Sequence, residues 1–219
     1  MKLIIVTAPT FFVEEDKIIT ALFEEGLDIL HLRKPETPAM YSERLLTLIP
    51  EKYHRRIVTH EHFYLKEEFD LMGIHLNTRN PNEPHDYSGH VSCTCHSVEE
   101  VKSKKHFYDY VFMSPVYDCI TKTGTLSGYT PEELRTAGKE RIIDTKVMAL
   151  GGITPDNILE IKDFGFAGVL IVFHEKVQEQ LCHKSTSFAV YSGYYNPPGR
   201  EWQAIPVDGA YSCPQPTRP

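Results

Sequence analysis

The sequence lacks the long hydrophobic runs, the excess of basic residues and the cysteine spacings that mark several large classes of protein. None of its apolar stretches approaches the roughly 20 residues of a membrane-spanning helix, so we expect no membrane partner. A formal net charge of −7 argues against binding to nucleic-acid backbones, which need a basic face. The apolar start at residues 1–6 is soon followed by Pro9 and an acidic run, which favours a strand over a signal peptide.

The cysteines form neither a metal-binding nor a disulfide pattern. There are five of them, and an odd number without secretory features predicts reduced thiols and a cytoplasmic protein. Cys93 and Cys95 precede His96, but they stand one residue too close together for a haem attachment motif. We interpret both as small apolar residues of a strand.

Short apolar segments alternate with segments of helical periodicity along most of the chain. The expected strands lie at residues 2–8, 28–33, 56–60, 73–77, 90–94, 108–113, 146–151 and 167–173. The expected helices lie at residues 14–25, 38–48, 61–68, 97–104, 130–138 and 154–164, and residues 80–89 form an irregular connector. Eight strands that alternate with helices predict an α/β protein, a (β/α)8 TIM barrel. An open doubly wound sheet is the alternative, but no G-x-G-x-x-G follows the first strand.

The composition changes towards the end of the chain. Residues 191–219 are rich in Pro, Gly and Tyr and show neither periodicity nor a candidate core. We therefore expect one catalytic barrel domain over residues 1–190 and an irregular tail over residues 191–219.

The site of such a barrel lies at the C-terminal ends of its strands, where this sequence places cationic, hydroxyl and glycine residues. Thr121 and Lys122 follow the sixth strand in a loop that suits a phosphate. Gly151 and Gly152 precede an expected helix start at Thr154, where free N–H groups would attract an anion. An ordinary turn remains the alternative for each of these loops. The candidates from the other strand ends are His31, Arg33, His60, Glu61, His75, Asn77, Thr94 and Val172.

Four histidines support a further alternative. His31, His60, His62 and His75 could converge at the strand ends and bind zinc or iron. Hydrogen-bonding histidines at a barrel mouth are the simpler interpretation, because no cysteine or aspartate completes the set.

Several motifs, in this order and spacing, resemble the thiamine-phosphate synthase family and its sister thiazole tautomerases over roughly residues 1–173. The resemblance rests on Leu32-Arg-Lys34, Gly73-Ile-His-Leu76, Thr94-Cys-His-Ser97, Tyr108-Asp-Tyr-Val111, Ser114-Pro-Val-Tyr117, Thr121-Lys122, Met148-Ala-Leu-Gly-Gly-Ile153 and Gly165-Phe-Ala-Gly-Val169.

The resemblance implies a transferase of thiamine biosynthesis that joins hydroxymethylpyrimidine diphosphate to thiazole phosphate and releases pyrophosphate with the help of Mg²⁺. It implies that Arg33 and Lys122 act on the diphosphate, and we add the neighbouring Lys34 to this catalytic set. Thr94 stands where a diphosphate-contacting serine is usual, and Thr121 and Gly152 match thiazole-phosphate contacts. We further predict substrate contacts from His31, His60, Gly151 and Val172. Family members commonly assemble, so a homo-oligomer is expected.

The sequence departs from the family at its metal site. Glu61 replaces one metal-binding aspartate and Asn80 replaces the other; we predict that these two residues bind Mg²⁺, although the amide is the poorer ligand. Pro35 stands where a lysine is usual, with Lys34 one residue early, and Phe173 replaces a serine. The tautomerase histidine falls on Ser114 or Pro115, so an isomerase would need His60, His62 or His75 instead. Such an isomerase and a non-catalytic phosphate binder are the alternatives.

Overall fold

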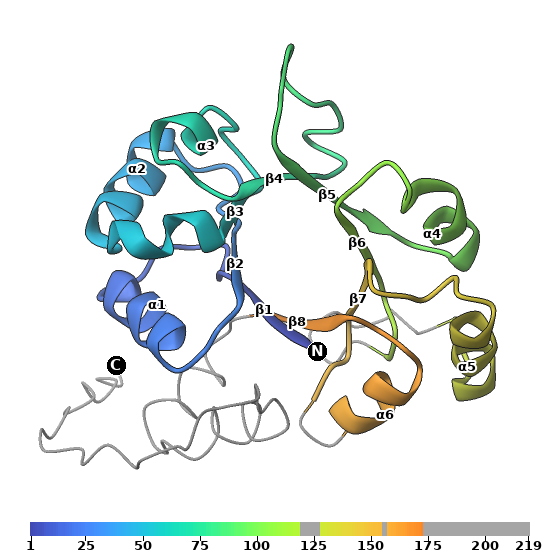
Figure 1. Cartoon of the computed structure of the whole chain (residues 1–219). Coiled ribbons are helices and arrows are strands. Elements are labelled where there is room, and N and C mark those ends of the chain that lie inside the picture. The colour runs from blue at the N-terminus through green and yellow to red at the C-terminus, as the bar shows by residue number, and fades with distance from the viewer. Residues whose placement is uncertain (119–127, 155–156, 173–219) are drawn as a thin grey trace, which may run out of the picture.

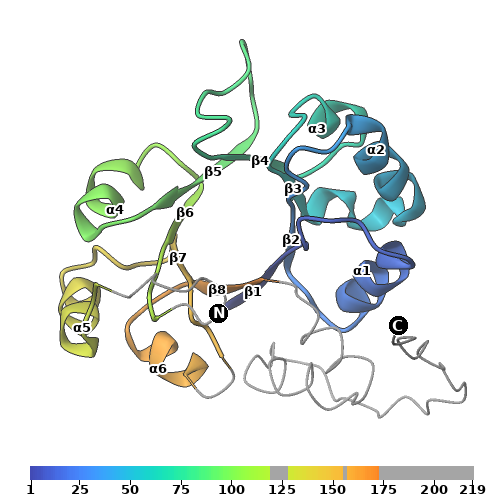
Figure 2. The same cartoon turned by 180° about the vertical axis from the view of Figure 1, so that it is seen from behind.

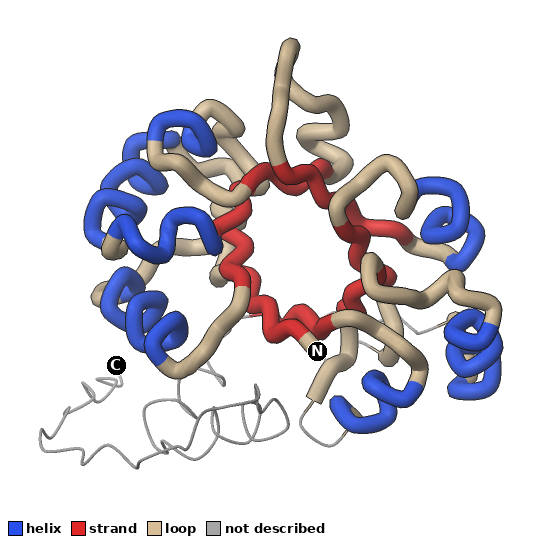
Figure 3. The backbone as a smooth tube through the Cα atoms, viewed as in Figure 1, coloured by secondary structure: helices blue, strands red, loops and turns tan. Residues whose placement is uncertain are grey.

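The computed structural model describes residues 1–118, 128–154 and 157–172. In this part of the chain, eight parallel strands form a closed barrel in sequence order, and the helices lie on its outside (Figure 1, Figure 3). The first and last strands close the ring, with Lys2 opposite Gly168 and Val6 opposite Val172. The predicted (β/α)8 TIM barrel is confirmed.

The elements follow the expected alternation. The strands are β1 (Lys2–Val6), β2 (Ile29–Leu32), β3 (Ile57–Thr59), β4 (Gly73–Leu76), β5 (His90–Cys95), β6 (Tyr110–Met113), β7 (Val147–Leu150) and β8 (Gly168–Val172). The helices are α1 (Glu15–Glu24), α2 (Ala39–Leu48), α3 (Leu65–Glu68), α4 (Val98–Lys104), α5 (Pro131–Lys139) and α6 (Ile158–Asp163). A 3₁₀ helix, η1 (Glu51–Arg56), lies between α2 and β3 and was not predicted.

Side chains alternate across each strand, and this alternation creates two cores. On β1, Leu3 and Ile5 belong to the large core between strands and helices, whereas Ile4 and Val6 belong to a smaller cluster inside the barrel. The period of two that strands impose is the cause. The inner cluster is completed by Ile29, Val58, Tyr110, Phe112, Met148 and Leu170.

Two details of the helices test the local predictions. At α5, Thr130 and Glu133 form a capping box and Pro131 occupies the first turn, as the sequence indicates. At α6, a start at Thr154 is wrong, because the helix begins at Ile158. The Asn157 amide accepts a hydrogen bond from the Thr154 N–H at 2.9 Å and donates one to the Gly152 carbonyl at 2.8 Å, which folds this stretch into a turn.

The segment between β4 and β5 projects from the ring as a loop, and no helix covers it (Figure 1). The reverse view shows the same circle of helices around the strands (Figure 2). Cys93 and Cys95 are buried free thiols of β5, as predicted. Within the described ranges, no helix combines the length and the apolar character needed to cross a bilayer. The predicted tail, 191–219, and its boundary at 190 lie outside the described residues.

Candidate active site at the carboxyl ends of the strands

Three histidines from neighbouring strands meet inside the barrel. His31, His60 and His75 each offer a ring nitrogen, and these nitrogens lie within 4.8 Å of one another. His31 Nδ1 lies 2.9 Å from His60 Nε2, and the rings of His60 and His75 stack with centroids 4.3 Å apart. The parallel register aligns β2, β3 and β4 and so brings together residues distant in sequence.

Ring nitrogens of His31 and His75 also contact hydroxyl groups. His31 Nε2 lies 2.6 Å from the Tyr110 hydroxyl. His75 Nδ1 lies 2.9 Å from Ser92 Oγ, and its Nε2 lies 3.1 Å from Thr94 Oγ1. The predicted site residues His31, His60 and Thr94 therefore share one hydrogen-bonded cluster, and Ser92 and Tyr110 are members that the sequence analysis did not select. The sequence could have indicated Ser92 and Tyr110, because both are polar residues in inward-facing positions of apolar strands.

Burial keeps this cluster uncharged. It lowers the pKa of His75 to about 3, and it lowers the pKa values of His31 and His60 well below their usual range, with further lowering from the neighbouring positive charges. Transfer of an imidazolium out of water is unfavourable, so the neutral form dominates near neutral pH. The inner surface below the mouth is therefore polar and neutral.

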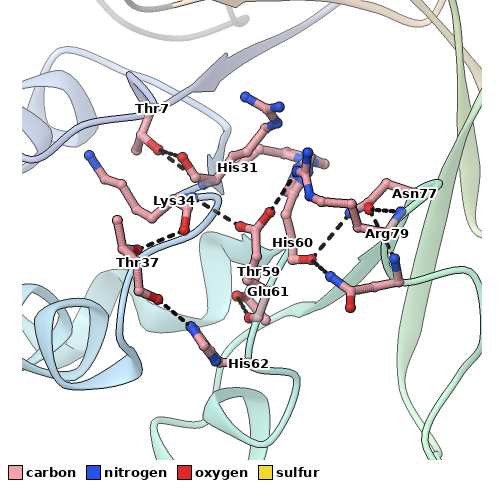
Figure 4. A network of polar contacts seen from close by, with 12 residues as sticks. Thr7, His31, Lys34, Thr37, Thr59, His60, Glu61, His62, Asn77 and Arg79 are labelled. Atoms are coloured by element: carbon pink, nitrogen blue, oxygen red, sulfur yellow. Dashed lines mark hydrogen bonds and ion pairs between the residues drawn. The ribbon is translucent and has the colours of Figure 1, made fainter.

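His62 does not join the other three histidines. Its Nε2 lies 3.0 Å from the Thr37 carbonyl oxygen in the loop after β2, as Figure 4 shows. The four-histidine metal cluster is thus reduced to three members, and each of the three already has a hydrogen-bond partner.

Charged side chains lie at the rim above this cluster. Glu61, just after β3, accepts a hydrogen bond from the Lys34 backbone N–H through Oε2 at 2.9 Å. Its other oxygen, Oε1, pairs with Arg79 Nη2 at 3.0 Å (Figure 4). The Glu61 side chain is 12% exposed and that of Arg79 is 44% exposed. The ion pair therefore joins a largely buried carboxylate to a guanidinium that is partly in contact with solvent.

Two amide side chains hold the loop that carries Arg79. Asn77 Oδ1 accepts hydrogen bonds from the backbone N–H groups of Arg79 at 2.9 Å and Asn80 at 3.1 Å. The Asn77 and Asn80 side-chain amides both donate to the His60 carbonyl oxygen, at 3.2 Å and 3.0 Å. The loop after β4 is therefore fixed to the end of β3, and the Asn80 amide acts as a brace within it.

Arg33 lies at the end of β2 beside β1. Its backbone N–H and carbonyl both hydrogen-bond to the Thr7 hydroxyl, at 3.0 Å and 3.1 Å. Its positive charge helps to lower the pKa values of both His60 and His75. This position suits the predicted role of Arg33 in binding a diphosphate.

Lys34 points elsewhere. Its ammonium forms an ion pair with both oxygens of Glu15 on α1, at 2.6 Å and 2.8 Å, and donates to the Thr10 carbonyl at 2.9 Å. Lys34 is 1% exposed and Glu15 is 3% exposed. Burial raises the pKa of Glu15 and lowers that of Lys34, while their contact opposes both shifts. A catalytic role for Lys34 stays a prediction, and this buried pair argues against it because the ammonium is already bound.

The loops after β6 and β7 pack backbone against backbone. Gly151 and Gly152 have positive φ values of 98° and 65°, and the Gly151 carbonyl accepts a hydrogen bond from the Tyr117 N–H at 3.1 Å. A methyl group on Gly152 would lie 2.6 Å from the Asp118 carbonyl oxygen. Glycine is thus required at 152 for close approach, which accounts for the pair without a ligand. A phosphate contact from these glycines stays a prediction.

Three further predicted residues complete the survey. Thr121 and Lys122 lie outside the described residues, so the phosphate loop stays a prediction. Val172 ends β8 and is 42% exposed, and a substrate contact there stays a prediction.

The predicted Mg²⁺ ligands were tested against the contacts they make. Mg²⁺ prefers several oxygen ligands in octahedral geometry, normally including carboxylates. Both oxygens of Glu61 already accept hydrogen bonds from a guanidinium and a backbone N–H, and Asn80 offers only a neutral amide. Among the described residues, the one group of three or more potential His, Cys, Asp or Glu ligands is the histidine cluster, which does not include Glu61. The described side chains do not fit a Mg²⁺ site at this rim.

Comparison with known proteins gives a consistent result. A family model described as thiamine monophosphate synthase matches residues 3–173. The thiamine-phosphate synthases of Halalkalibacterium halodurans and Methanobrevibacter smithii are 23% and 25% identical, over 72% and 73% of this chain and 80% of each relative.

Solved structures agree with the sequence comparison. The crystal structure of thiamine phosphate pyrophosphorylase from Bacteroides thetaiotaomicron is 73% identical, with a TM-score of 0.76, and the match covers 87% of this chain and 92% of that one. The Pyrococcus furiosus thiamine phosphate pyrophosphorylase, 18% identical with a TM-score of 0.61 over 78% of this chain and 85% of that one, shares the fold. With a barrel, a cationic rim and a family match that spans 171 of its 219 residues, the chain belongs to the thiamine monophosphate synthase family.

Proposed function

We propose that this protein joins hydroxymethylpyrimidine diphosphate to thiazole phosphate, forming thiamine phosphate and pyrophosphate. The observation that carries the proposal is the family match over residues 3–173. The site supports it, because Arg33 lies at the carboxyl ends of the strands above a neutral polar cluster.

The chemistry requires a carbon–oxygen bond to break and a carbon–nitrogen bond to form. The electron pair of the broken bond leaves with pyrophosphate, and the thiazole nitrogen donates the pair that forms the new bond. Stabilisation of the leaving group is mainly electrostatic. Arg33 would bind its negative charge, and Thr94 would donate a hydrogen bond near the diphosphate. Lys122 and Thr121 would act from the loop after β6.

The neutral interior suits the pyrimidine part of the substrate. An imidazolium beside a developing pyrimidine cation would oppose ionisation, because like charges repel. The lowered pKa values of His31, His60 and His75 keep that region uncharged. The rings would then act as hydrogen-bonding groups that orient the heterocycle.

The family generally uses Mg²⁺, and its use by this chain stays a prediction of the resemblance. Small-molecule substrates follow from the proposed reaction, whereas a homo-oligomer and a cytoplasmic location stay predictions.

The test is an assay of the purified protein with both substrates that measures thiamine phosphate and pyrophosphate. We expect both products in equal amounts, and we expect Arg33→Ala to lower kcat/KM by about 100-fold or more, as loss of a charge-stabilising donor does. Arg55→Ala is the matched control, because Arg55 pairs with Asp70 on the surface and both residues precede their strands, at the end of the barrel opposite the mouth. Correctly folded protein that forms neither product would contradict the proposal, and thiazole isomerisation or phosphate binding alone would favour the alternatives.

A further inference from the structure

The rim contains a positive charge at the position where the family resemblance predicts a metal ion. Glu61 and Asn80 are the predicted Mg²⁺ ligands, and the residue next to Asn80 is Arg79, whose Nη2 pairs with Glu61 Oε1 at 3.0 Å. The carboxylate is only 12% exposed, so it has little contact with water and depends on its partners for neutralisation.

We propose that the Arg79 guanidinium takes the place of a divalent cation on Glu61 and that Arg79 and Arg33 bind the diphosphate directly, without a metal ion. The proposal rests on the proposed function, which supplies the diphosphate as the ligand.

The position of Arg79 is fixed before any ligand binds. Its backbone N–H donates to Asn77 Oδ1, and Asn77 and Asn80 are both bound to the His60 carbonyl. The loop therefore presents Arg79 in one orientation beside Glu61 (Figure 4). A preorganised donor loses little conformational freedom on binding, which favours its use as an anion ligand.

The Arg79 guanidinium has N–H donors that its contact with Glu61 does not use. A guanidinium has five N–H groups in a planar fork that matches phosphate oxygens, and the contact with Glu61 is made through Nη2. The side chain is 44% exposed, so part of the fork faces the solvent at the mouth. It can therefore hold Glu61 and a phosphate oxygen together, as a metal ion would.

Arg33 and Arg79 act on the same region. Arg33 directly follows β2 and Arg79 follows β4, so both lie at the carboxyl ends of the strands, and the charges of both lower the pKa of His60. Two guanidinium groups at the same end of the barrel provide a positive field for a diphosphate. A divalent cation between them would be repelled by both charges and would find the Glu61 oxygens already in use.

The test is calorimetric binding of inorganic pyrophosphate to the full-length protein, in EDTA and in Mg²⁺. We expect binding in EDTA, with a Kd that Mg²⁺ changes by less than about 3-fold. Arg79→Gln should weaken binding in EDTA by about 10-fold or more, because it removes a charge-assisted contact, and Arg79→Lys should restore part of the affinity. Arg55→Gln is the matched control and should leave the Kd unchanged.

A second variant reverses the proposed replacement. Arg79→Glu places a second carboxylate beside Glu61 and leaves the Asn80 contact with the His60 carbonyl in place, and pyrophosphate binding should then require Mg²⁺. Wild-type binding only in the presence of Mg²⁺, or an Arg79→Gln protein with unchanged affinity in EDTA, would overturn the proposal. Because the probe is pyrophosphate alone, these results are independent of product formation. Metal-free binding without thiamine phosphate synthesis would refute the proposed reaction and leave the role of Arg79 intact.

Discussion

The two halves of the barrel mouth are built from different parts of the polypeptide. At the ends of β2, β3 and β4, charged and amide side chains bind one another, and the Arg79–Glu61 pair is the central contact. At the ends of β6 and β7, in the part of the chain that the structure describes, backbone packs on backbone around Gly152. The first half therefore offers charge, and the second half offers a close-fitting surface.

This difference explains why the two halves tolerate change differently. The charged rim is held by side-chain contacts such as the Arg79–Glu61 pair, so one side chain there can be exchanged without displacing the backbone. Backbone packing has no such freedom, because an added methyl group at Gly152 would overlap a carbonyl oxygen. Family resemblance is accordingly retained at Gly151 and Gly152 and is weaker at Glu61 and Asn80.

The largest effect is expected from the buried ion pair between Lys34, which follows β2, and Glu15 on α1. Lys34→Ala leaves the Glu15 carboxylate buried and unpaired, so the free energy of unfolding should fall by about 3–5 kcal/mol. Lys17→Ala is the matched control, because the Lys17–Glu14 pair is exposed, and its effect should stay below about 1 kcal/mol. Equal effects of the two variants in denaturant unfolding would show that burial does not govern the strength of these pairs.

In the close-packed half, Gly152→Ala should be the most damaging small substitution. The residue has a φ of 65° and lacks room for a side chain, so we expect a loss of about 1–3 kcal/mol from strain and a shift of the loop after β6. Gly128→Ala is the control, since no atom of the described residues lies within 4 Å of a methyl group there. Thermal unfolding of both variants measures the difference. A Gly152→Ala protein as stable as Gly128→Ala would contradict the packing argument.

The smallest effect concerns the neutral cluster of His31, His60 and His75. It appears as a pH dependence of the free energy of unfolding. The pKa of His75 is lowered from 6.5 to about 3 in the folded protein. The unfolded chain therefore binds a proton at a pH where the folded chain does not, and stability should fall as the pH falls from about 6.5 towards 3, by about 1 kcal/mol per pH unit for each such histidine. Denaturant unfolding of the wild type and of His75→Asn between pH 7 and 5 tests this, and the variant should show a shallower slope. Identical slopes would mean that His75 is protonated in the fold.

Most of the fold follows from local patterns in the sequence. Short, nearly continuous apolar runs at 2–6 and 168–172 predict buried strands of a parallel sheet, and the repeated strand–helix order predicts the barrel. The start of α6 was misplaced because Asn157 uses its side chain to close a turn on Gly152 and Thr154. Asparagine competes with helix formation in this way, and the apolar spacing does not reveal which outcome prevails.

The sequence predicted where the site residues lie, at the carboxyl ends of the strands, but it did not predict which side chains contact one another. His31, His60 and His75 lie in or directly after the parallel strands β2, β3 and β4, so their meeting follows from the strand order, although His31 is in register with Val58 rather than with His60. The pairs Arg79–Glu61 and Lys34–Glu15 link residues 18 and 19 positions apart, across loops whose course depends on tertiary structure. The available signal for Arg79 was its position: the acidic Glu61 follows β3, and Arg79 is a basic residue in the loop after the next strand, β4. Nothing in the local sequence distinguished Glu15 from the other acidic residues of α1.

The most direct test of this account is a crystal structure of the protein with pyrophosphate bound, grown in EDTA. The account predicts phosphate oxygens within hydrogen-bonding distance of the Arg33 and Arg79 guanidinium groups, with Glu61 still paired to Arg79 and the three histidines beneath them uncontacted by the anion. Pyrophosphate bound away from both arginines would contradict it. So would binding that appears only when Mg²⁺ is added and that places the metal ion on Glu61 with Arg79 displaced.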